Sequence, residues 1–200
     1  QKLIIDPQLV WATFFAGNAT DGPMSATCDA NGNLFVTGYS GSVDFPVQNA
    51  GTYYDGTWNG NEDCFILKFN NAGALLWSTF YGGSSSDWGK SISCDNNNNV
   101  FVTGITWSDD FPTLNVGTYY DGVFGGSWRD AFILKFDNAG NRLWATYYGG
   151  KEDEEGNSIT CDNNNNVFIT GYTKSGTTGP GAFPLLSAGP RGRATPRIDR

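Results

Sequence analysis

The segment ISCDNNNNVFVTG at Ile92–Gly104 recurs almost unchanged as ITCDNNNNVFITG at Ile159–Gly171. The two copies agree at 11 of 13 positions. A more divergent copy, ATCDANGNLFVTG, occupies Ala26–Gly38. Copies of one segment at a regular spacing indicate a repeat protein, in which each copy belongs to one supersecondary unit.

A second block repeats in the same order and fixes the period. Cys64–Gly83 (CFILKFNNAGALLWSTFYGG) recurs as Ala131–Gly150 (AFILKFDNAGNRLWATYYGG). Between the blocks, DFPVQNAGTYYDG from Asp44 recurs as DFPTLNVGTYYDG from Asp110. Equivalent tryptophans lie 66 and 67 residues apart, at Trp11, Trp77 and Trp144. The 200 residues therefore hold about three units.

Each unit is predicted to contain four short strands. SISCD and VFVTGIT flank an asparagine turn, and FILKF and LWATYY flank the turn DNAG. Phe132, Leu134 and Phe136 share one face, as the two-residue period of a strand requires. Two hairpins in series at constant spacing are typical of β-propeller blades. We therefore predict an all-β propeller-type array of about three four-stranded antiparallel blades, with SISCD innermost and LWSTF outermost.

The predicted propeller is incomplete. The units run over residues 9–75, 76–142 and 143–182, the last of them truncated, and residues 183–200 read as an irregular basic tail. Closed propellers take roughly four to eight blades, and three blades leave unpaired sheet edges. We expect a fragment of a larger propeller, completed by the remaining blades of a parent chain or by self-association.

The repeated motifs resemble those of a known family. VFVTG, DFP, FILKF-x-NAG and LW-[AS]-T-[FY]-YGG are similar to the bacterial SBBP repeat, which is named for a seven-bladed β-propeller, over roughly residues 9–175. Members of that family are mostly large exported or surface proteins. The resemblance implies an extracellular or bacterial cell-surface location, and it supplies no catalytic residue.

Composition excludes several classes of function. The chain has no histidine, which removes the commonest general base and the commonest zinc ligand. The net charge of −8 argues against a nucleic-acid partner, whose phosphates need a basic surface. No apolar run reaches the 18 residues of a membrane helix, so we expect no membrane span.

Asp29-x-Asn31-x-Asn33 and its copies from Asp95 and Asp162 have two interpretations. Oxygen side chains at alternate positions begin many calcium loops. Asparagine and aspartate also close tight turns through side-chain to backbone hydrogen bonds, and both tolerate left-handed backbone geometry. No glutamate follows at the twelfth position of a calcium loop. We expect hairpin turns without a metal or other cofactor, with calcium binding as the alternative.

The four cysteines are expected to remain unpaired. Cys28, Cys94 and Cys161 occupy the same strand position in successive units, and Cys64 stands on a third strand. First and third strands of one sheet lie about 9–10 Å apart, beyond the roughly 7 Å limit for a disulfide. Buried thiols acting as small apolar groups are therefore expected.

The long loops GTYYDGTWNGNED and GTYYDGVFGGSWRD hold the candidate ligand-binding residues. A flat aromatic ring covers one face of a sugar while a nearby acid binds its hydroxyl groups. The alternative is that these rings cap the blade and hold the loop in place. The candidates are Tyr53, Tyr54, Asp55, Trp58, Tyr119, Tyr120, Asp121 and Trp128.

The expected function is a non-enzymatic extracellular or cell-surface module that acts as a scaffold or binds protein or glycan. The alternative is a glycosidase-like propeller enzyme, which needs two carboxylates facing each other across a sugar. Asp21, Asp87 and Glu154 stand in equivalent loops and are the acids available for that role. Their equivalence favours a turn role repeated in each blade.

Overall fold

Every regular element in the described part of the chain is a β-strand. The computed structural model describes residues 9–51, 53–115, 121–125 and 127–184. Within these ranges, no helix is long and apolar enough to span a membrane. The strands are β1 (Asp21–Cys28), β2 (Leu34–Ser40), β3 (Asp63–Phe69), β4 (Leu75–Tyr81), β5 (Asp87–Cys94), β6 (Val100–Thr106), β7 (Asp130–Phe136), β8 (Arg142–Tyr148), β9 (Glu154–Cys161) and β10 (Val167–Thr173).

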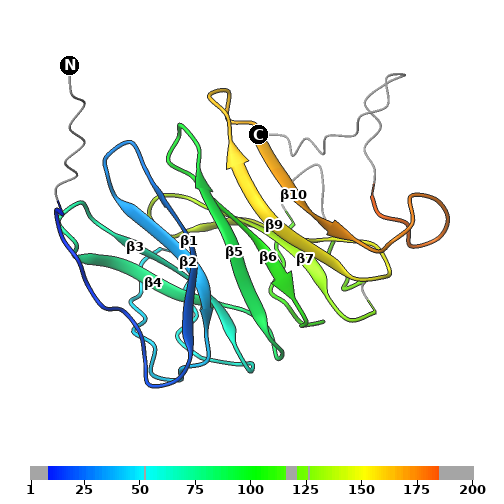
Figure 1. The fold of residues 1–200 in the computed structure, drawn as a ribbon, viewed down its shortest axis with the longest axis horizontal. Helices are drawn as coiled ribbons and strands as arrows, with labels where there is room; N and C mark the ends of the chain where they lie inside the picture. Colours follow the sequence, from blue (N-terminus) through cyan, green and yellow to red (C-terminus); the bar gives the residue numbers. More distant parts are fainter. Residues whose placement is uncertain (1–8, 52, 116–120, 126, 185–200) are drawn as a thin grey trace, which may run out of the picture.

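The strands form antiparallel sheets that match the predicted blades. The first blade is β1-β2-β3-β4, the second is β5-β6-β7-β8, and the third consists of β9 and β10 among the described residues. The inner strands β1, β5 and β9 lie side by side (Figure 1). Ile92 N donates to Ser25 Oγ (3.3 Å), and Ile159 N donates to Ser91 Oγ (3.1 Å). The predicted all-β, propeller-type fold is confirmed.

Aromatic rings fill the space between the first two blades. The Tyr81 ring lies 5.1 Å from that of Phe111 and 5.9 Å from that of Phe136, and Trp77 stacks on Phe136 at 6.3 Å. All four side chains are buried. Strands β3 and β6 are buried at every residue because both of their faces are covered. This explains why their sequences are apolar runs without polar alternation.

A glycine allows each following inner strand to approach the preceding blade closely. A Cβ atom on Gly89 of β5 would stand 2.1 Å from Thr37 Oγ1 and 2.8 Å from Cys64 Sγ. A Cβ atom on Gly156 of β9 would stand 2.0 Å from Thr103 Oγ1. The spacing between an inner strand and the neighbouring blade therefore depends on the absence of a side chain at these positions.

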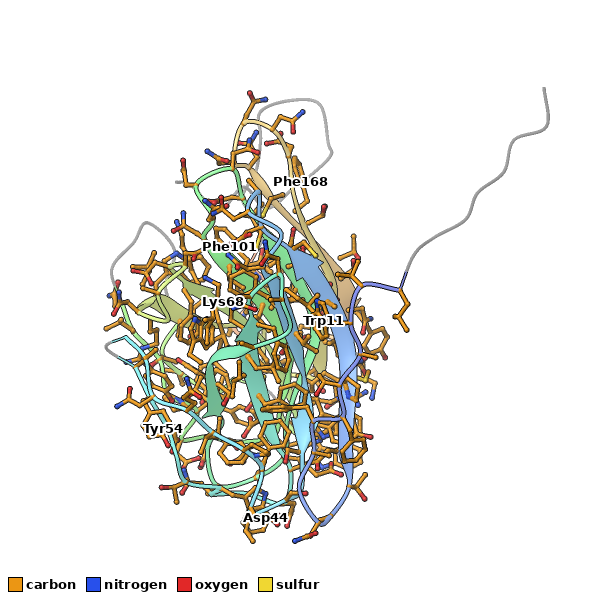
Figure 2. All side chains as sticks on the ribbon, turned by 90° about the vertical axis from the view of Figure 1, so that its left-hand side faces the viewer. Trp11, Asp44, Tyr54, Lys68, Phe101 and Phe168 are labelled. Atoms are coloured by element: carbon orange, nitrogen blue, oxygen red, sulfur yellow. The ribbon has the colours of Figure 1, made fainter. Side chains whose placement is uncertain are left out.

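The segment before β1 packs like the outermost strand of a preceding blade. The Trp11 and Phe15 rings lie 5.6 and 5.4 Å from the ring of Phe69 on the first blade. Trp77 and Tyr81 make the equivalent contacts on the second blade. Figure 2 labels Trp11 where this segment runs along the first blade. The segment forms no strand, because no described sheet lies beside it to supply ladder hydrogen bonds.

The asparagine-rich segments are tight turns, as predicted. Asp29 Oδ1 accepts hydrogen bonds from the backbone N–H groups of Asn31 and Asn33, both at 2.9 Å. The left-handed position of each turn is Gly32 (φ 76°), Asn98 (φ 59°) or Asn165 (φ 62°). The carboxylate of the motif therefore serves its own turn. The described residues contain no cluster of three or more histidine, cysteine or acidic residues that could hold a metal.

The long loop between the second and third strands of each complete blade covers the outer edge of that blade. Gln48 pairs with Ser78 of β4 through two backbone hydrogen bonds of 3.0 Å. Leu114 pairs with Ala145 of β8 in the same way. Exposed edges are sites of unwanted strand pairing, so this cover protects the outermost strands.

The described structure contains no disulfide, and all four thiols are free, as predicted. Cys64 is fully buried, and burial raises its pKa to about 12. Burial also raises the pKa of Cys94 to about 12. Of the four thiols, the expected full burial holds for Cys64, whereas Cys94 and Cys161 are half-buried. The expectation is wrong for Cys28, which is exposed because no described inner strand precedes β1.

The start of the predicted tail packs on the second blade. The Phe183 ring contacts that of Tyr148 at 5.2 Å, and Tyr148 Oη donates to the carbonyl of Pro184 (3.2 Å). Tyr81 makes the same two contacts with Phe111 and the carbonyl of Pro112. Residues 185–200 of the predicted tail lie outside the described residues.

Candidate ligand-binding site

The first of the predicted binding tyrosines, Tyr53, belongs to the packed interior. Its ring lies 4.8 Å from that of Tyr81 and 6.0 Å from that of Phe136, and the Arg142 guanidinium lies 4.7 Å above it. Burial raises the pKa of its hydroxyl. Tyr53 therefore anchors the loop. Tyr54, in contrast, is exposed on the loop at the periphery of the first blade (Figure 2).

The two predicted aspartates close their own loops. Asp55 Oδ1 accepts a hydrogen bond from Thr57 N (2.9 Å), and the backbone N–H of Asp55 donates to Thr79 Oγ1 (2.8 Å). Asp121 Oδ1 accepts from Val123 N (3.1 Å) in the equivalent loop. Partial burial raises the pKa of both carboxyl groups.

The two predicted tryptophans differ in exposure. Trp58 packs against the apolar cluster of the first blade, and its Nε1 is buried without an acceptor. Trp128 is 69 % exposed, so its ring is open to a ligand. Tyr119 and Tyr120 lie outside the described residues. Of the aromatic candidates that the structure describes, Tyr54 and Trp128 are the exposed ones.

The structure shows an aromatic pocket that the sequence analysis missed. A shallow cavity of about 220 Å³ is lined by two tryptophans and three small polar residues, namely Trp88, Trp107, Asn61, Ser85 and Ser86. The two tryptophan rings lie 5.4 Å apart at 65°. Ligand sites commonly combine such rings with a few polar groups.

Neighbouring residues hold the Trp88 ring in place. Trp88 stacks on Tyr39 with ring centroids 4.9 Å apart. Its Nε1 donates a hydrogen bond to Glu62 Oε2 (2.8 Å). A ring fixed on one side and hydrogen-bonded at its edge loses little freedom when a ligand binds, which favours affinity.

A fixed charge cluster borders Trp107. The Arg129 guanidinium lies 5.9 Å from the Trp107 ring centre. Glu155 holds this arginine through an ion pair of 2.6 Å and also pairs with Lys90 Nζ at 2.7 Å. Both signs of charge are present, so the border supplies hydrogen-bond donors and acceptors rather than a field of one sign.

The tryptophans of the pocket are absent from the other units. The position of Trp88 is occupied by Gly22 in the first unit and by Glu155 in the third. The position of Trp107 is occupied by Gly41 and Lys174. Residues that the blade fold needs recur in each unit, and these two do not. This departure from the repeat is the sequence signal that could have identified the pocket.

Trp128 is related to the same pocket by the repeat. It stands two residues before β7, and the pocket residue Asn61 stands two residues before β3. Trp128 thus has the same place in the second blade as Asn61 has in the first. Trp88 at the start of β5, Trp107 just after β6 and Trp128 just before β7 all lie at the same end of the second blade.

Two of the three acids considered for catalysis lie beneath the surface. Asp87 and Glu154 have no exposed area. Asp87 Oδ2 accepts hydrogen bonds from Gly83 N (2.8 Å) and Ser108 Oγ (2.9 Å), and Asp21 Oδ2 accepts from Gly17 N (2.7 Å). These carboxyl groups organise the loop that joins successive blades. They do not face each other across an open site.

Comparisons with known proteins agree with the blade structure. Residues 76–112 and 143–176 match the family model described as SBBP, a beta-propeller repeat. An uncharacterized WD repeat-containing protein of Acanthamoeba polyphaga mimivirus is 28% identical over 193 residues, which covers 84% of this chain and 14% of that protein. The regulatory protein FlaEY of Caulobacter vibrioides is 25% identical over 151 residues, covering 72% of this chain and 16% of that protein. These two segments of the chain therefore match the SBBP beta-propeller repeat.

Proposed function

We propose that the chain is a non-enzymatic binding module of a larger repeat protein, and that it binds a glycan at the Trp88–Trp107 pocket. The repeated blades form the scaffold. The observation that carries the proposal is the presence of Trp88 and Trp107, which no other unit has at the equivalent positions. They line a pocket together with Asn61, Ser85 and Ser86.

The chemistry of the pocket suits a sugar. The C–H face of a pyranose packs on an indole ring, and amide and hydroxyl groups bind the sugar hydroxyls. The volume of about 220 Å³ lies below the 300–1,000 Å³ of drug-sized ligands, which suits a single sugar ring of a longer glycan. A protein ligand is the competing proposal, because repeat scaffolds also bind extended partners.

The location proposed for this module is extracellular or at a bacterial cell surface. The resemblance to exported repeat proteins supports it, and sugars exposed at cell surfaces would be available there. Cell fractionation combined with digestion of intact cells by an added protease tests the location. Protection of the protein until the cells are lysed would contradict it.

A glycan array followed by titration calorimetry tests the binding. We expect Trp107→Ala to weaken binding of the array hit by at least about tenfold, because truncation of a central aromatic anchor typically costs that much. Trp88→Ala should have a similar effect, and Trp128→Ala a smaller one. Trp58→Ala is the matched control, since its ring packs inside the first blade.

Three outcomes decide between the alternatives. Unchanged affinity of a correctly folded Trp107→Ala variant would refute the assigned pocket. An array without any hit would contradict the glycan proposal and leave the protein ligand as the better explanation of the surface. Release of new reducing ends from a bound glycan would overturn the non-enzymatic assignment.

A further inference from the structure

Two buried carboxyl groups meet where the first blade joins the second. Asp63 begins β3 and Asp87 begins β5, and their exposed fractions are 1% and 0%. Gly82 lies beside both of them. A Cβ atom on Gly82 would stand 3.0 Å from Asp63 Oδ1 and 2.7 Å from Asp87 Oδ2. The fold thus places two acidic groups from different blades around one point.

Each carboxyl group has one oxygen that accepts no hydrogen bond. Asp63 Oδ2 accepts from Asn59 N (2.8 Å), and Asp87 Oδ2 accepts from Gly83 N and Ser108 Oγ. The Oδ1 atoms of both residues are buried and lack a partner. A buried polar atom without a partner is costly, so such a pair needs an explanation.

No cation compensates the two acids. The ion pairs of the described residues are Lys90–Glu155, Arg129–Glu155 and Lys174–Asp153. The titratable groups that face the pair are Asp55 from the loop before β3, Cys64 of β3 and Tyr147 of β8. All of these are neutral or negative, so two carboxylates here would repel each other in a medium of low dielectric constant.

We infer that the Asp63–Asp87 pair holds a proton in the assembled protein, and that loss of this proton loosens the junction between the first and second blades. A bound proton would relieve the burial of both Oδ1 atoms, which are sealed from solvent and meet no donor. The charge of the pair falls from −2 to −1 when one proton is held. The pair therefore acts as a pH-sensitive latch between the two blades.

The direction of the pH effect follows from burial. Burial raises the pKa of Asp63 to about 6 and that of Asp87 to about 7, from an ordinary value of 3.8. A carboxyl whose pKa is higher in the folded state stabilises the fold at low pH and loses that contribution as the pH rises through the folded-state value. The latch therefore contributes fully below about pH 4 and opens as the pH rises through about pH 6 to pH 7.

The next junction supplies an internal comparison. Asp130 and Glu154 stand at the equivalent positions, and a Cβ atom on Gly149 would lie 2.9 Å from an oxygen of each. Glu154 Oε1 accepts from Thr173 Oγ1 (2.7 Å), and its Oε2 accepts from Gly150 N (3.0 Å). In the first junction, Asp87 Oδ1 is buried and no donor meets it with full hydrogen-bond geometry, although the hydroxyl of Thr106, the counterpart of Thr173, is close enough to lower the Asp87 pKa. We therefore assign the latch to the first junction.

Thermal melting of the intact chain between pH 5 and pH 8 tests the latch. We expect the melting temperature to fall by roughly 5–10 °C over this range. Asp87→Asn and Asp63→Asn keep the shape of the side chain and remove the charge, so each should reduce that fall by about half or more. Asp109→Asn, at an exposed acid, is the matched control and should keep the full fall.

A second readout does not depend on the stability of a variant. The infrared band of a protonated carboxyl should be present in the wild-type protein at pH 6.5 and weaker in Asp87→Asn, while Asp109→Asn retains it. Absence of the band together with a flat pH profile would overturn the inference. A large rise in melting temperature on adding calcium, lost in both asparagine variants, would instead show that the pair binds a cation.

Discussion

The two blade junctions share their interior and differ at their surface. In the first, Tyr81 contacts Phe111 and its hydroxyl donates to the carbonyl of Pro112. In the second, Tyr148 makes the same contacts with Phe183 and Pro184. At the rim, Trp88 and Trp107 of the first junction are replaced by Glu155 and Lys174. The packing of a blade is thus repeated while the positions around it vary, and the proposed binding site lies at the varied positions.

The largest contrast should appear on deletion of the central phenylalanine of each junction. Phe111→Ala removes a ring that is 3% exposed and touches Tyr81, Phe132 and Tyr147. We expect it to lower the free energy of unfolding by about 3–5 kcal/mol. Phe183→Ala removes a half-buried ring and should cost about 1 kcal/mol.

Urea unfolding followed by tryptophan fluorescence measures both variants. Equal losses would show that the second junction is packed as completely as the first. A loss confined to Phe183→Ala would contradict the comparison itself, because the better-buried ring would then contribute less.

A smaller contrast is expected at the glycines of the inner strands. Gly89→Ala should cost about 1–3 kcal/mol, because the new methyl group would overlap Thr37 Oγ1 and Cys64 Sγ between two complete blades. Gly156→Ala meets Thr103 in the same way, but β9 and β10 form a sheet of two described strands that can shift more easily. Differential scanning calorimetry compares the two, and a larger loss for Gly156→Ala would refute this reasoning.

The smallest effect is expected at the charged rim of the second junction. Lys174 pairs with Asp153 at 2.6 Å, and the lysine side chain is 53% exposed. Lys174→Ala should change the free energy of unfolding by less than about 0.5 kcal/mol, since exposed ion pairs contribute little. Chemical denaturation at low and high salt checks this. A loss above about 2 kcal/mol would mean that the Lys174–Asp153 ion pair stabilises the second junction far more than an ordinary surface ion pair does.

The repeat made most of the fold predictable. Strand positions, the hairpin turns with a left-handed Asn98 or Asn165, and the unpaired cysteines follow from local sequence chemistry. That the segment around Trp11 forms no strand could not be foreseen, because its sequence matches that of the outer strands around Trp77 and Trp144. The segment differs from them only in having no neighbouring sheet among the described residues. Local patterns describe what a segment prefers and not whether a partner is present.

The candidate site was harder to predict because it is assembled from separate loops. Asn61, Ser85 and Trp107 come from three connections that are distant in sequence and converge only in the folded blades. Trp58 looked suitable on its loop, yet its ring packs against the apolar cluster of the first blade. Trp128, in contrast, is exposed, and its register in the repeat equals that of Asn61.

The loop that covers the outermost strand has a consequence for assembly. Because Gln48 pairs with Ser78 of β4, and Leu114 with Ala145 of β8, part of the outer hydrogen-bonding edge of each complete blade is already used. Addition of a strand at this edge is therefore hindered, whereas the faces of the blades still allow growth around the ring. The same scaffold can therefore be lengthened one blade at a time without becoming a template for lateral aggregation.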